Sequence, residues 1–185
     1  MKTRIWICVV LTVALAACAH TGSKAPTSFN AALPEGWRAI DSEEPMLFMT
    51  KDGGYKQFIM IRERPVTDPF VFTQRSMYAG MLPEQAAELV VNEIIADTNI
   101  SNFSLLENVP TRIAGHNGFR LTFIYSDAHG FIFKTIYYGF IKGGTFYTIR
   151  YGATEDPTKE NYFQRDLKTF QQVFESFKLA ASKAS

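Results

Sequence analysis

Cys18 is the residue whose chemistry is easiest to interpret, because a thiol can be bonded to a lipid or to a second thiol. It follows an apolar run of 13 residues, 5–17, which begins directly after a basic start made by Lys2 and Arg4. A helix needs about 20 apolar residues to cross a bilayer, so this run is too short to be a membrane-spanning helix. A basic start, an apolar middle and small residues before the cut are the layout of a secretory signal. The sequence therefore predicts export.

The residues just before the cysteine make the prediction more specific. Leu15, Ala16, Ala17 and Cys18 resemble the lipobox of bacterial lipoproteins, whose pattern is Leu-Ala/Ser-Gly/Ala-Cys. The resemblance implies a diacylglyceryl group on the Cys18 thiol, cleavage just before it and acylation of the new amino terminus. Two or more acyl chains are enough for stable anchoring, where one chain is marginal. Residues 1–17 are then a lipoprotein signal peptide, and the protein reaches the membrane through lipid on Cys18.

Two other interpretations of Cys18 stay open, an incidental small residue in an ordinary signal and a disulfide partner. The only other cysteine, Cys8, lies in the segment to be removed, which disfavours a disulfide within the mature chain. Residues 19–32 are small, polar and without periodicity, so 18–32 is predicted to be the lipidated cysteine and a flexible tether. Ala19 stands where an aspartate would signal inner-membrane retention by the enteric sorting rule. If the source has two membranes, this favours the outer membrane, facing the periplasm.

The charge balance excludes one class of partner. Removal of residues 1–17 leaves 17 basic and 18 acidic residues, a net charge of −1. Nucleic-acid binders normally carry a basic excess, because neutralisation of phosphates drives their affinity. No nucleic-acid partner is therefore predicted, and a polybasic membrane patch is equally absent from the sequence.

The remaining residues that could do chemistry do not form a convincing site. His116 and His129, the latter near Asp127, fall in predicted turns at opposite ends of the strand 119–126, roughly 26 Å apart at ~3.3 Å per residue. Both are expected to be solvent-exposed turn residues, so no metal or other cofactor is predicted. The chain also has no G-x-S-x-G, HExxH, Walker or GxGxxG pattern. A non-catalytic protein is predicted, and a hydrolase is the least favoured alternative.

Two further features have both a structural and a functional interpretation. Tyrosines near the end of the chain could form an aromatic binding surface, but packing under the helices is the favoured interpretation. They are Tyr137, Tyr138, Tyr147 and Tyr151. Asp166 falls on the apolar side of the last predicted helix. It is expected to lie at the margin of that side and to reach water, with a bond to Arg150 or Arg120 as the alternative.

The elements that position these residues are mainly β-strands joined by tight turns. Strands are predicted at 37–40, 46–50, 55–63, 103–115, 119–126, 131–142 and 145–153, with turns at 51–54, 115–118, 127–130 and 142–144. Pro110 indicates an edge strand or a bulge. The segment 131–141 is apolar on both faces, so both are expected to be covered.

Two helices are predicted to provide that cover. One begins at Pro83 and runs to about Thr98, with an apolar side formed by small and branched residues. The other begins with Asp156 as N-cap and Pro157 at the first position. Its apolar side carries Phe163, Leu167, Phe170, Phe174 and Phe177. Residues 65–82 have no clear pattern. The predicted fold class is α+β, an antiparallel sheet of about six to seven strands sandwiched between helices.

Four stretches make residues 33–179 resemble the PsbP-like domain. They are LPEGW at 33–37, IAGHNGFRLTF at 113–123, FYTIRYGA at 146–153 and FQQVFESFK at 170–178. This fold is shared by the photosystem protein PsbP, the Ran-binding Mog proteins and many bacterial envelope lipoproteins. The resemblance implies one PsbP-like globular domain, followed by a tail at 180–185, and an accessory binding role.

The expected function is therefore a non-catalytic, lipid-anchored protein of the bacterial cell envelope that docks onto or assists another envelope component. The identity of that protein partner is not encoded in any motif. The alternative is a carrier of a small apolar ligand, with its cavity between an aromatic face of the sheet and residues 65–82.

Overall fold

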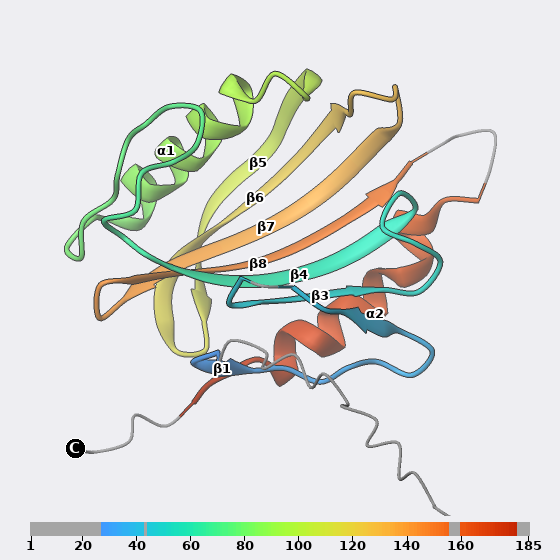
Figure 1. The fold of residues 1–185 in the computed structure, drawn as a ribbon, viewed down its shortest axis with the longest axis horizontal. Helices are drawn as coiled ribbons and strands as arrows, with labels where there is room; N and C mark the ends of the chain where they lie inside the picture. The colour runs from blue at the N-terminus through green and yellow to red at the C-terminus, as the bar shows by residue number, and fades with distance from the viewer. Residues whose placement is uncertain (1–26, 43, 156–159, 181–185) are drawn as a thin grey trace, which may run out of the picture.

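The computed structural model describes residues 27–42, 44–155 and 160–180. Within them, one antiparallel sheet has the strand order β2-β3-β4-β8-β7-β6-β5, and two helices lie on its opposite faces (Figure 1). Its strands are β2 (Arg38–Ile40), β3 (Met46–Thr50), β4 (Gln57–Pro65), β5 (Ser101–Ile113), β6 (His116–Ser126), β7 (Ile132–Lys142) and β8 (Thr145–Thr154). The predicted α+β class, with a helix-covered antiparallel sheet, is confirmed.

Each helix covers only part of its face. Helix α1 (Pro83–Ala96) packs against β5, β6 and β7, whereas α2 (Tyr162–Ser176) packs against β8 and β4 on the other side. A separate apolar cluster lies under each helix. Among the described residues, part of each sheet face is therefore left without a helix.

Strand β7 contributes to both clusters, as its sequence predicts. Phe133, Tyr137 and Ile141 point to the α1 side, while the alternate residues, including Tyr138 and Phe140, point to the α2 side. A strand whose two faces are both apolar needs cover on both sides. The position of β7 between the two helix-covered halves satisfies that need.

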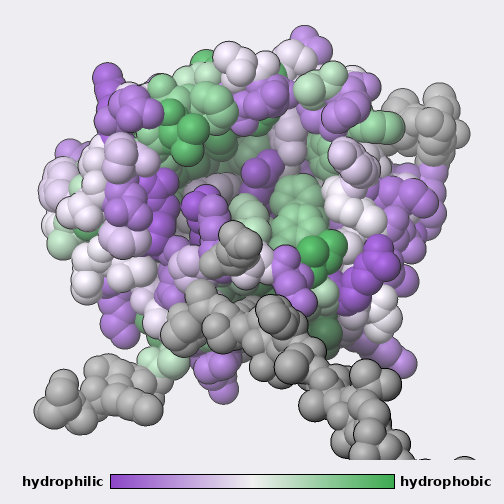
Figure 2. Space-filling view, viewed as in Figure 1, coloured by the Kyte–Doolittle hydropathy of each residue, from purple (hydrophilic) through white to green (hydrophobic). Residues whose placement is uncertain are grey.

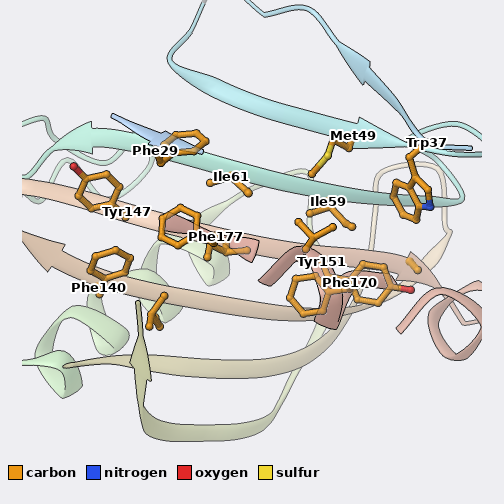
Figure 3. Packing of buried hydrophobic residues seen from close by; sticks show 14 of the residues in the cluster. Phe29, Trp37, Met49, Ile59, Ile61, Phe140, Tyr147, Tyr151, Phe170 and Phe177 are labelled. Atoms are coloured by element: carbon orange, nitrogen blue, oxygen red, sulfur yellow. The ribbon is translucent and has the colours of Figure 1, made fainter. Parts of the chain in front are cut away.

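The cluster on the α2 side is built from stacked aromatic rings over branched aliphatic residues (Figure 3). The Tyr151 ring stacks on Phe170 and Phe163, with centroid distances of 5.0 and 5.2 Å. Offset ring pairs at these distances add about 0.5–1.5 kcal/mol each to the area they bury. The Tyr151 hydroxyl donates to the carbonyl oxygen of Phe163 at 2.9 Å, so its polar end is satisfied within the core.

Helix α2 begins later than the sequence predicts. Its N-cap is Asn161, whose side-chain oxygen accepts a hydrogen bond from the backbone N–H of Gln164 at 3.0 Å. Asparagine is among the best N-cap residues, because its oxygen satisfies a free helix N–H. The predicted cap at Asp156 and Pro157 was therefore wrong as the helix start, and those two residues lie outside the described part of the chain.

One predicted turn is also misplaced. The sequence predicts a turn at 115–118, but the turn residues are Ala114 and Gly115, which have φ angles of 47° and 83°. Positive φ at both central residues is the geometry of a tight hairpin turn whose twist matches the strands. Strand β6 therefore starts at His116, which pairs with Ile113 and stacks on Phe140 with 5.5 Å between ring centroids.

Strand β5 is the outer strand of the sheet, as Pro110 predicts. Pro110 lies opposite Phe119 of β6, and the other side of β5 has no partner strand in the described residues. Proline lacks a backbone N–H, so it fits an edge, where one side of the strand has no ladder to complete.

A second, two-stranded sheet joins the two ends of the domain. Strand β1 (Phe29–Asn30) pairs with β9 (Lys178–Leu179), and the Phe29 side chain is only 3% exposed. The Phe29 ring lies 5.9 Å from the ring of Phe177. The sequence assigned residues 18–32 to a flexible tether, but the packing of Phe29 shows that the domain begins before Leu33.

Residues 65–82, which the sequence left unassigned, form a loop that packs beside α1. Val66, Phe70 and Met77 are buried in the α1-side cluster. Glu93 of α1 holds the tip of the loop, because its carboxylate accepts hydrogen bonds from the backbone N–H groups of Phe72 and Thr73, both at 2.9 Å. The loop is thus part of the core rather than a cover over a cavity.

The Glu93 anchor should make this loop sensitive to acid. Burial would raise the pKa of Glu93, but the hydrogen bonds from Phe72 and Thr73 outweigh it and lower the pKa below the ordinary value of 4.5. A carboxylate with a depressed folded pKa stabilises the fold above its unfolded pKa and loses that contribution as the pH falls through the folded value. We expect the amide NMR signals of Phe72 and Thr73 to titrate together with a midpoint below 4.5.

Two variants test this expectation. Glu93→Gln should abolish the titration and increase hydrogen exchange in the loop, because a neutral amide accepts more weakly than a carboxylate. Glu88→Gln, on the exposed side of the same helix, should change neither. A midpoint at or above 4.5, or an unchanged titration in Glu93→Gln, would show that Glu93 does not hold the loop.

Candidate functional site

The lipobox residues Leu15, Ala16, Ala17 and Cys18 lie outside the described residues, so lipid attachment stays a prediction.

The first described residues enter the domain next to β4. The backbone N–H of Ser28 donates to the Glu63 carboxylate at 2.9 Å, and the Ser28 hydroxyl lies 2.7 Å from that of Tyr147. The entry point is thus held at the Pro65 end of β4.

The structure does not bring the histidines together. His129 lies in the β6–β7 turn with its Nδ1 3.8 Å from Asp127, and it is mostly exposed. His116 lies at the other end of β6, half-buried in the strand rather than in a turn. Among the described residues, no group of three or more histidine, cysteine, aspartate or glutamate side chains is arranged to hold a metal ion.

Three of the four tyrosines considered as an aromatic binding surface instead pack under a helix, which was the favoured interpretation. Tyr138, Tyr147 and Tyr151 all lie in the cluster under α2, and the Tyr138 ring is 4.3 Å from that of Phe174. Tyr137 points to the opposite face, beyond the reach of α2. Its surroundings differ from those of the other three tyrosines.

Asp166 has a different position and partner from those predicted. It is only 4% exposed, and it accepts hydrogen bonds from Arg165 Nε at 2.9 Å and Nη2 at 2.6 Å. Neither proposed partner reaches it. Arg150 lies on the other side of the sheet, and Arg120 pairs with Glu107 at 2.6 Å.

Arg165 is the centre of an ion cluster that fixes the start of α2. Besides Asp166, its guanidinium bonds Glu160 at 2.8 Å and Asp52 of the β3–β4 turn at 2.5 Å. Burial would lower the pKa of Arg165, but these carboxylates raise it above its usual value. The cluster explains why an aspartate is tolerated in the apolar side of α2: its charge is paired and hydrogen-bonded.

The most unusual surface is the part of the α1 side of the sheet that α1 does not cover, which we call the open face. One row of paired residues crosses it from Ile40 through Phe48, Met60 and Arg150 to Tyr137. The full set is Ile40, Phe48, Phe58, Met60, Arg62, Arg64, Tyr137, Thr148 and Arg150. Figure 2 shows hydrophilic and hydrophobic side chains beside each other in the recessed middle of the molecule, seen from the same side as Figure 1.

The composition of the open face is that of a protein interface. Aromatic residues, methionine and arginine are enriched in the centres of protein–protein interfaces, whereas lysine, aspartate and glutamate are depleted there. The open face has all three enriched kinds and none of the depleted ones. Most of its side chains are half-buried, and Ile40 is 43% exposed.

Arg150 occupies the middle of this face. Its guanidinium lies 5.1 Å from the Phe58 ring centroid and 5.7 Å from that of Tyr125, and Nη2 donates to the Tyr125 hydroxyl at 2.9 Å. Within the described residues, its buried Nε has no hydrogen-bond partner. The aromatic rings hold the side chain in place without neutralising it.

Burial, and not the neighbouring arginines, determines the direction of the pKa shift of Tyr137. Burial raises the pKa of Tyr137 to about 12, although Arg150, Arg64 and Arg62 lie close enough to lower it. Burial also lowers the pKa of Arg64, and the charge of neighbouring Arg62 lowers it further. The open face thus combines closely spaced positive charges with a phenol that stays protonated and can donate a hydrogen bond.

Gly152 lets the Phe58 ring lie flat on the sheet beneath Arg150. A Cβ atom at this position would come within 2.5 Å of the ring. The Phe58 ring also stacks on Phe48, with a centroid distance of 5.6 Å. The absence of a side chain at Gly152 therefore allows the Phe58 ring to approach the backbone of β8 this closely.

A separate hollow of about 520 Å³ lies at the far end of the sheet, lined by residues of the β3–β4 and β6–β7 turns and of the start of α2. Its lining includes Tyr55, Phe131 and Ile132, which are 65%, 46% and 47% exposed. Along β4 it is about 26 Å from the Glu63 end, at ~3.3 Å per residue. A smaller hollow of about 210 Å³ touches the end of the 65–82 loop at Met81.

Sequence reasoning missed the open face. The signal was present in the alternation of β4, where Phe58, Met60, Arg62 and Arg64 share one side. Arg150 was considered only as a partner for Asp166. The alternation of side chains along a strand does not indicate which part of a sheet face a helix will cover. The exposure of these residues could therefore not be predicted from the sequence.

No known protein-family model matches the chain, and no curated protein sequence matches it either. In the described residues, neither helix has the length and apolarity required to span a membrane.

Solved structures share the fold at low sequence identity. LpqN of Mycobacterium tuberculosis, described as involved in cell envelope biogenesis, has a TM-score of 0.55 and 14% identity, and the match covers 87% of each chain. The cyanobacterial PsbP of Synechocystis sp. PCC 6803 has a TM-score of 0.54 and 12% identity over 89% of this chain and 98% of its own. The Ran-binding protein Mog1p of Saccharomyces cerevisiae has a TM-score of 0.53 and 8% identity over 82% and 90%.

These likenesses establish the architecture. The domain has the fold of the PsbP and Mog proteins, as the sequence resemblance predicts. Identities this low show fold alone, because unrelated functions are carried by the same scaffold.

Proposed function

We propose that this protein is an exported, lipid-anchored component of a bacterial cell envelope, and that its domain is a non-catalytic module that docks onto another envelope protein. Lipid on Cys18 anchors it to the membrane, on the periplasmic side of the outer one if the source has two. Residues 19–26 separate the anchor from the first described residue, Thr27.

The open face is the observation that carries the docking role. It offers a continuous row of side chains of the kinds that interfaces favour, and neither helix of the described residues covers it. The structural neighbours support the same role: LpqN is described as involved in cell envelope biogenesis, and Mog1p as Ran-binding. Neither neighbour is described as an enzyme.

In-cell photo-crosslinking tests the docking role. A photoreactive residue in place of Ile40, at the exposed end of the open face, should crosslink the anchored protein to another envelope protein. The same residue in place of Lys168, which is exposed on α2, should not. If neither position crosslinks, or both give the same products, the open face is not the docking surface.

The second candidate function, a carrier of a small apolar ligand, is favoured by the far-end hollow. Its volume lies within the range of ordinary ligand pockets, and its lining is rich in aromatic side chains. The sequence predicted the cavity beside residues 65–82, where a hollow of about 210 Å³ lies at Met81, whereas the hollow of about 520 Å³ lies at the far end of the sheet. Native mass spectrometry distinguishes the two functions, since a carrier purified from cells should retain a bound mass.

A further inference from the structure

The strands that form the open face bring arginine, and no acidic residue, to that side. Strands β2, β4 and β8 contribute Arg38, Arg62, Arg64 and Arg150. In the described residues, the aspartates and glutamates near these arginines come from elsewhere. They are Glu44 at 2.9 Å from Arg62, and Asp68 and Glu93, whose charges act on Arg64.

In the described residues Arg150 and Arg64, unlike Arg62, are not paired with a carboxylate. Within the described residues, no carboxylate oxygen lies within 4.0 Å of Arg150, and its single hydrogen bond is to the Tyr125 hydroxyl. A guanidinium has five N–H donors, and its planar fork matches a carboxylate in bidentate geometry. Most of that capacity is unused. A partly buried, uncompensated charge favours any ligand that brings the opposite charge.

The residues around Arg150 would complete such a site. Tyr137 lies directly opposite it on β7, and Thr148 lies two residues before it on β8, opposite Arg62 of β4. The diagonal neighbours Arg62 and Arg150 are about 7–8 Å apart at their Cα atoms, close enough for both to reach one ligand. The phenol of Tyr137 stays protonated at neutral pH, so it can donate to an acceptor.

The shape of the face and its apolar residues indicate the kind of molecule that carries the negative charge. Phe48, Phe58 and Met60 surround the arginines, so the ligand must also bury apolar groups. Figure 2 shows that the middle of this side of the molecule is hollowed, and a hollow suits a protruding segment better than a flat lipid surface. The positive charge comes from arginine packed on aromatic rings, the form that proteins use at interfaces.

We propose that the open face binds a protein segment in which carboxylate side chains alternate with apolar ones, and that Arg150 and Arg62 bind the carboxylates. This rests on the proposed docking function and specifies the chemistry of its partner. The carboxylate replaces the water around Arg150, while the apolar side chains pack on Phe48, Phe58 and Met60.

The test uses the purified full chain in detergent on an array of random capped octapeptides, with no assumed partner sequence. We expect the bound peptides to be enriched in aspartate and glutamate, and replacement of these by asparagine and glutamine to weaken binding at least about tenfold, as for loss of a charge-assisted hydrogen bond. Arg150→Met should cause a similar loss. Arg112→Met, on the exposed edge strand β5, should retain full binding. Equal thermal midpoints of both variants would show that folding is preserved.

The possible failures are distinguishable. If peptides bind without acidic enrichment, or if Arg150→Met retains the enrichment, the partner chemistry is wrong although docking stands. If no peptide binds and the photoreactive Ile40 chain also gives no crosslink, the docking function itself fails. A third outcome is that no peptide binds, but the protein sediments with phosphatidylglycerol vesicles and Arg150→Met abolishes this. The ligand of the open face would then be an anionic lipid surface and not a protein segment.

Discussion

Replacement of Cys18 by alanine should move the protein from the detergent phase to the aqueous phase in phase-partitioning experiments. The thiol is the only attachment point that the lipobox offers, and the preceding apolar run of 13 residues is too short to anchor the chain. Loss of two or more acyl chains removes several kcal/mol of membrane affinity, at about 0.8 kcal/mol for each buried CH₂ group. Mass spectrometry of the wild-type protein should show the acyl chains on a chain that begins at Cys18.

Two matched variants control for an effect on export. Cys8→Ala changes the other cysteine, which lies in the predicted signal peptide, and should leave partitioning unchanged. Ala17→Gly keeps the lipobox pattern and should also leave the protein in the detergent phase. A Cys18→Ala protein that partitions as the wild type does, or a wild-type product with an unmodified thiol, would remove the basis for the anchor and for the proposed location.

The second large effect is expected from Gly118→Ala, near the start of β6. An added Cβ would lie 2.4 Å from the carbonyl oxygen of Gly139 on β7, and 2.9 Å from atoms of Ile113 and Phe140. The nearest of these atoms belongs to the backbone, so it cannot move aside without separating β6 from β7. Overpacking of this kind costs about 1–3 kcal/mol, and the backbone contact places Gly118→Ala near ~3 kcal/mol. In a domain of this size that lowers the thermal midpoint by about 6–12 °C.

Gly80→Ala is the matched control for this prediction. No heavy atom lies within 4 Å of the Cβ that it would add, and its backbone has no positive φ. It should leave the free energy of unfolding unchanged or raise it by about 0.4–1 kcal/mol, because alanine restricts the unfolded chain. Urea unfolding of both variants measures the difference. A Gly118→Ala chain as stable as Gly80→Ala would show that β6 and β7 are less closely packed than the structure indicates.

Much of the fold could be predicted because it depends on local patterns. The alternation in β7 predicts which of its residues face each side, and Phe133 and Phe140 lie in opposite clusters as expected. The spacing of Phe163 and Phe170 similarly predicts the buried side of α2, because residues seven apart share one side of a helix. The tight turn before β6 was predicted only to within a few residues, since the positive φ angles fall at Ala114 and Gly115.

The candidate site could not be predicted in the same way. Phe48 and Met60 come from consecutive strands, but Arg150 lies far from them in the sequence, and only the pairing of β4 with β8 places it beside them. Asp166 shows the same limit in another form. It lies on the apolar side of α2 as predicted, but it is buried rather than at the margin, and its partner Arg165 is determined by the side-chain packing at the start of the helix.

By itself, the sequence determined the signal and lipobox pattern, the kinds of elements and the side of each element that is apolar. Tertiary structure alone decided which part of each sheet face the two helices cover, and therefore that neither helix of the described residues lies over Arg150 and its neighbours. The physical reason is that periodicity encodes the direction of a side chain relative to its own strand or helix. The position of a helix over a sheet depends on contacts summed over many distant residues, which no local pattern records.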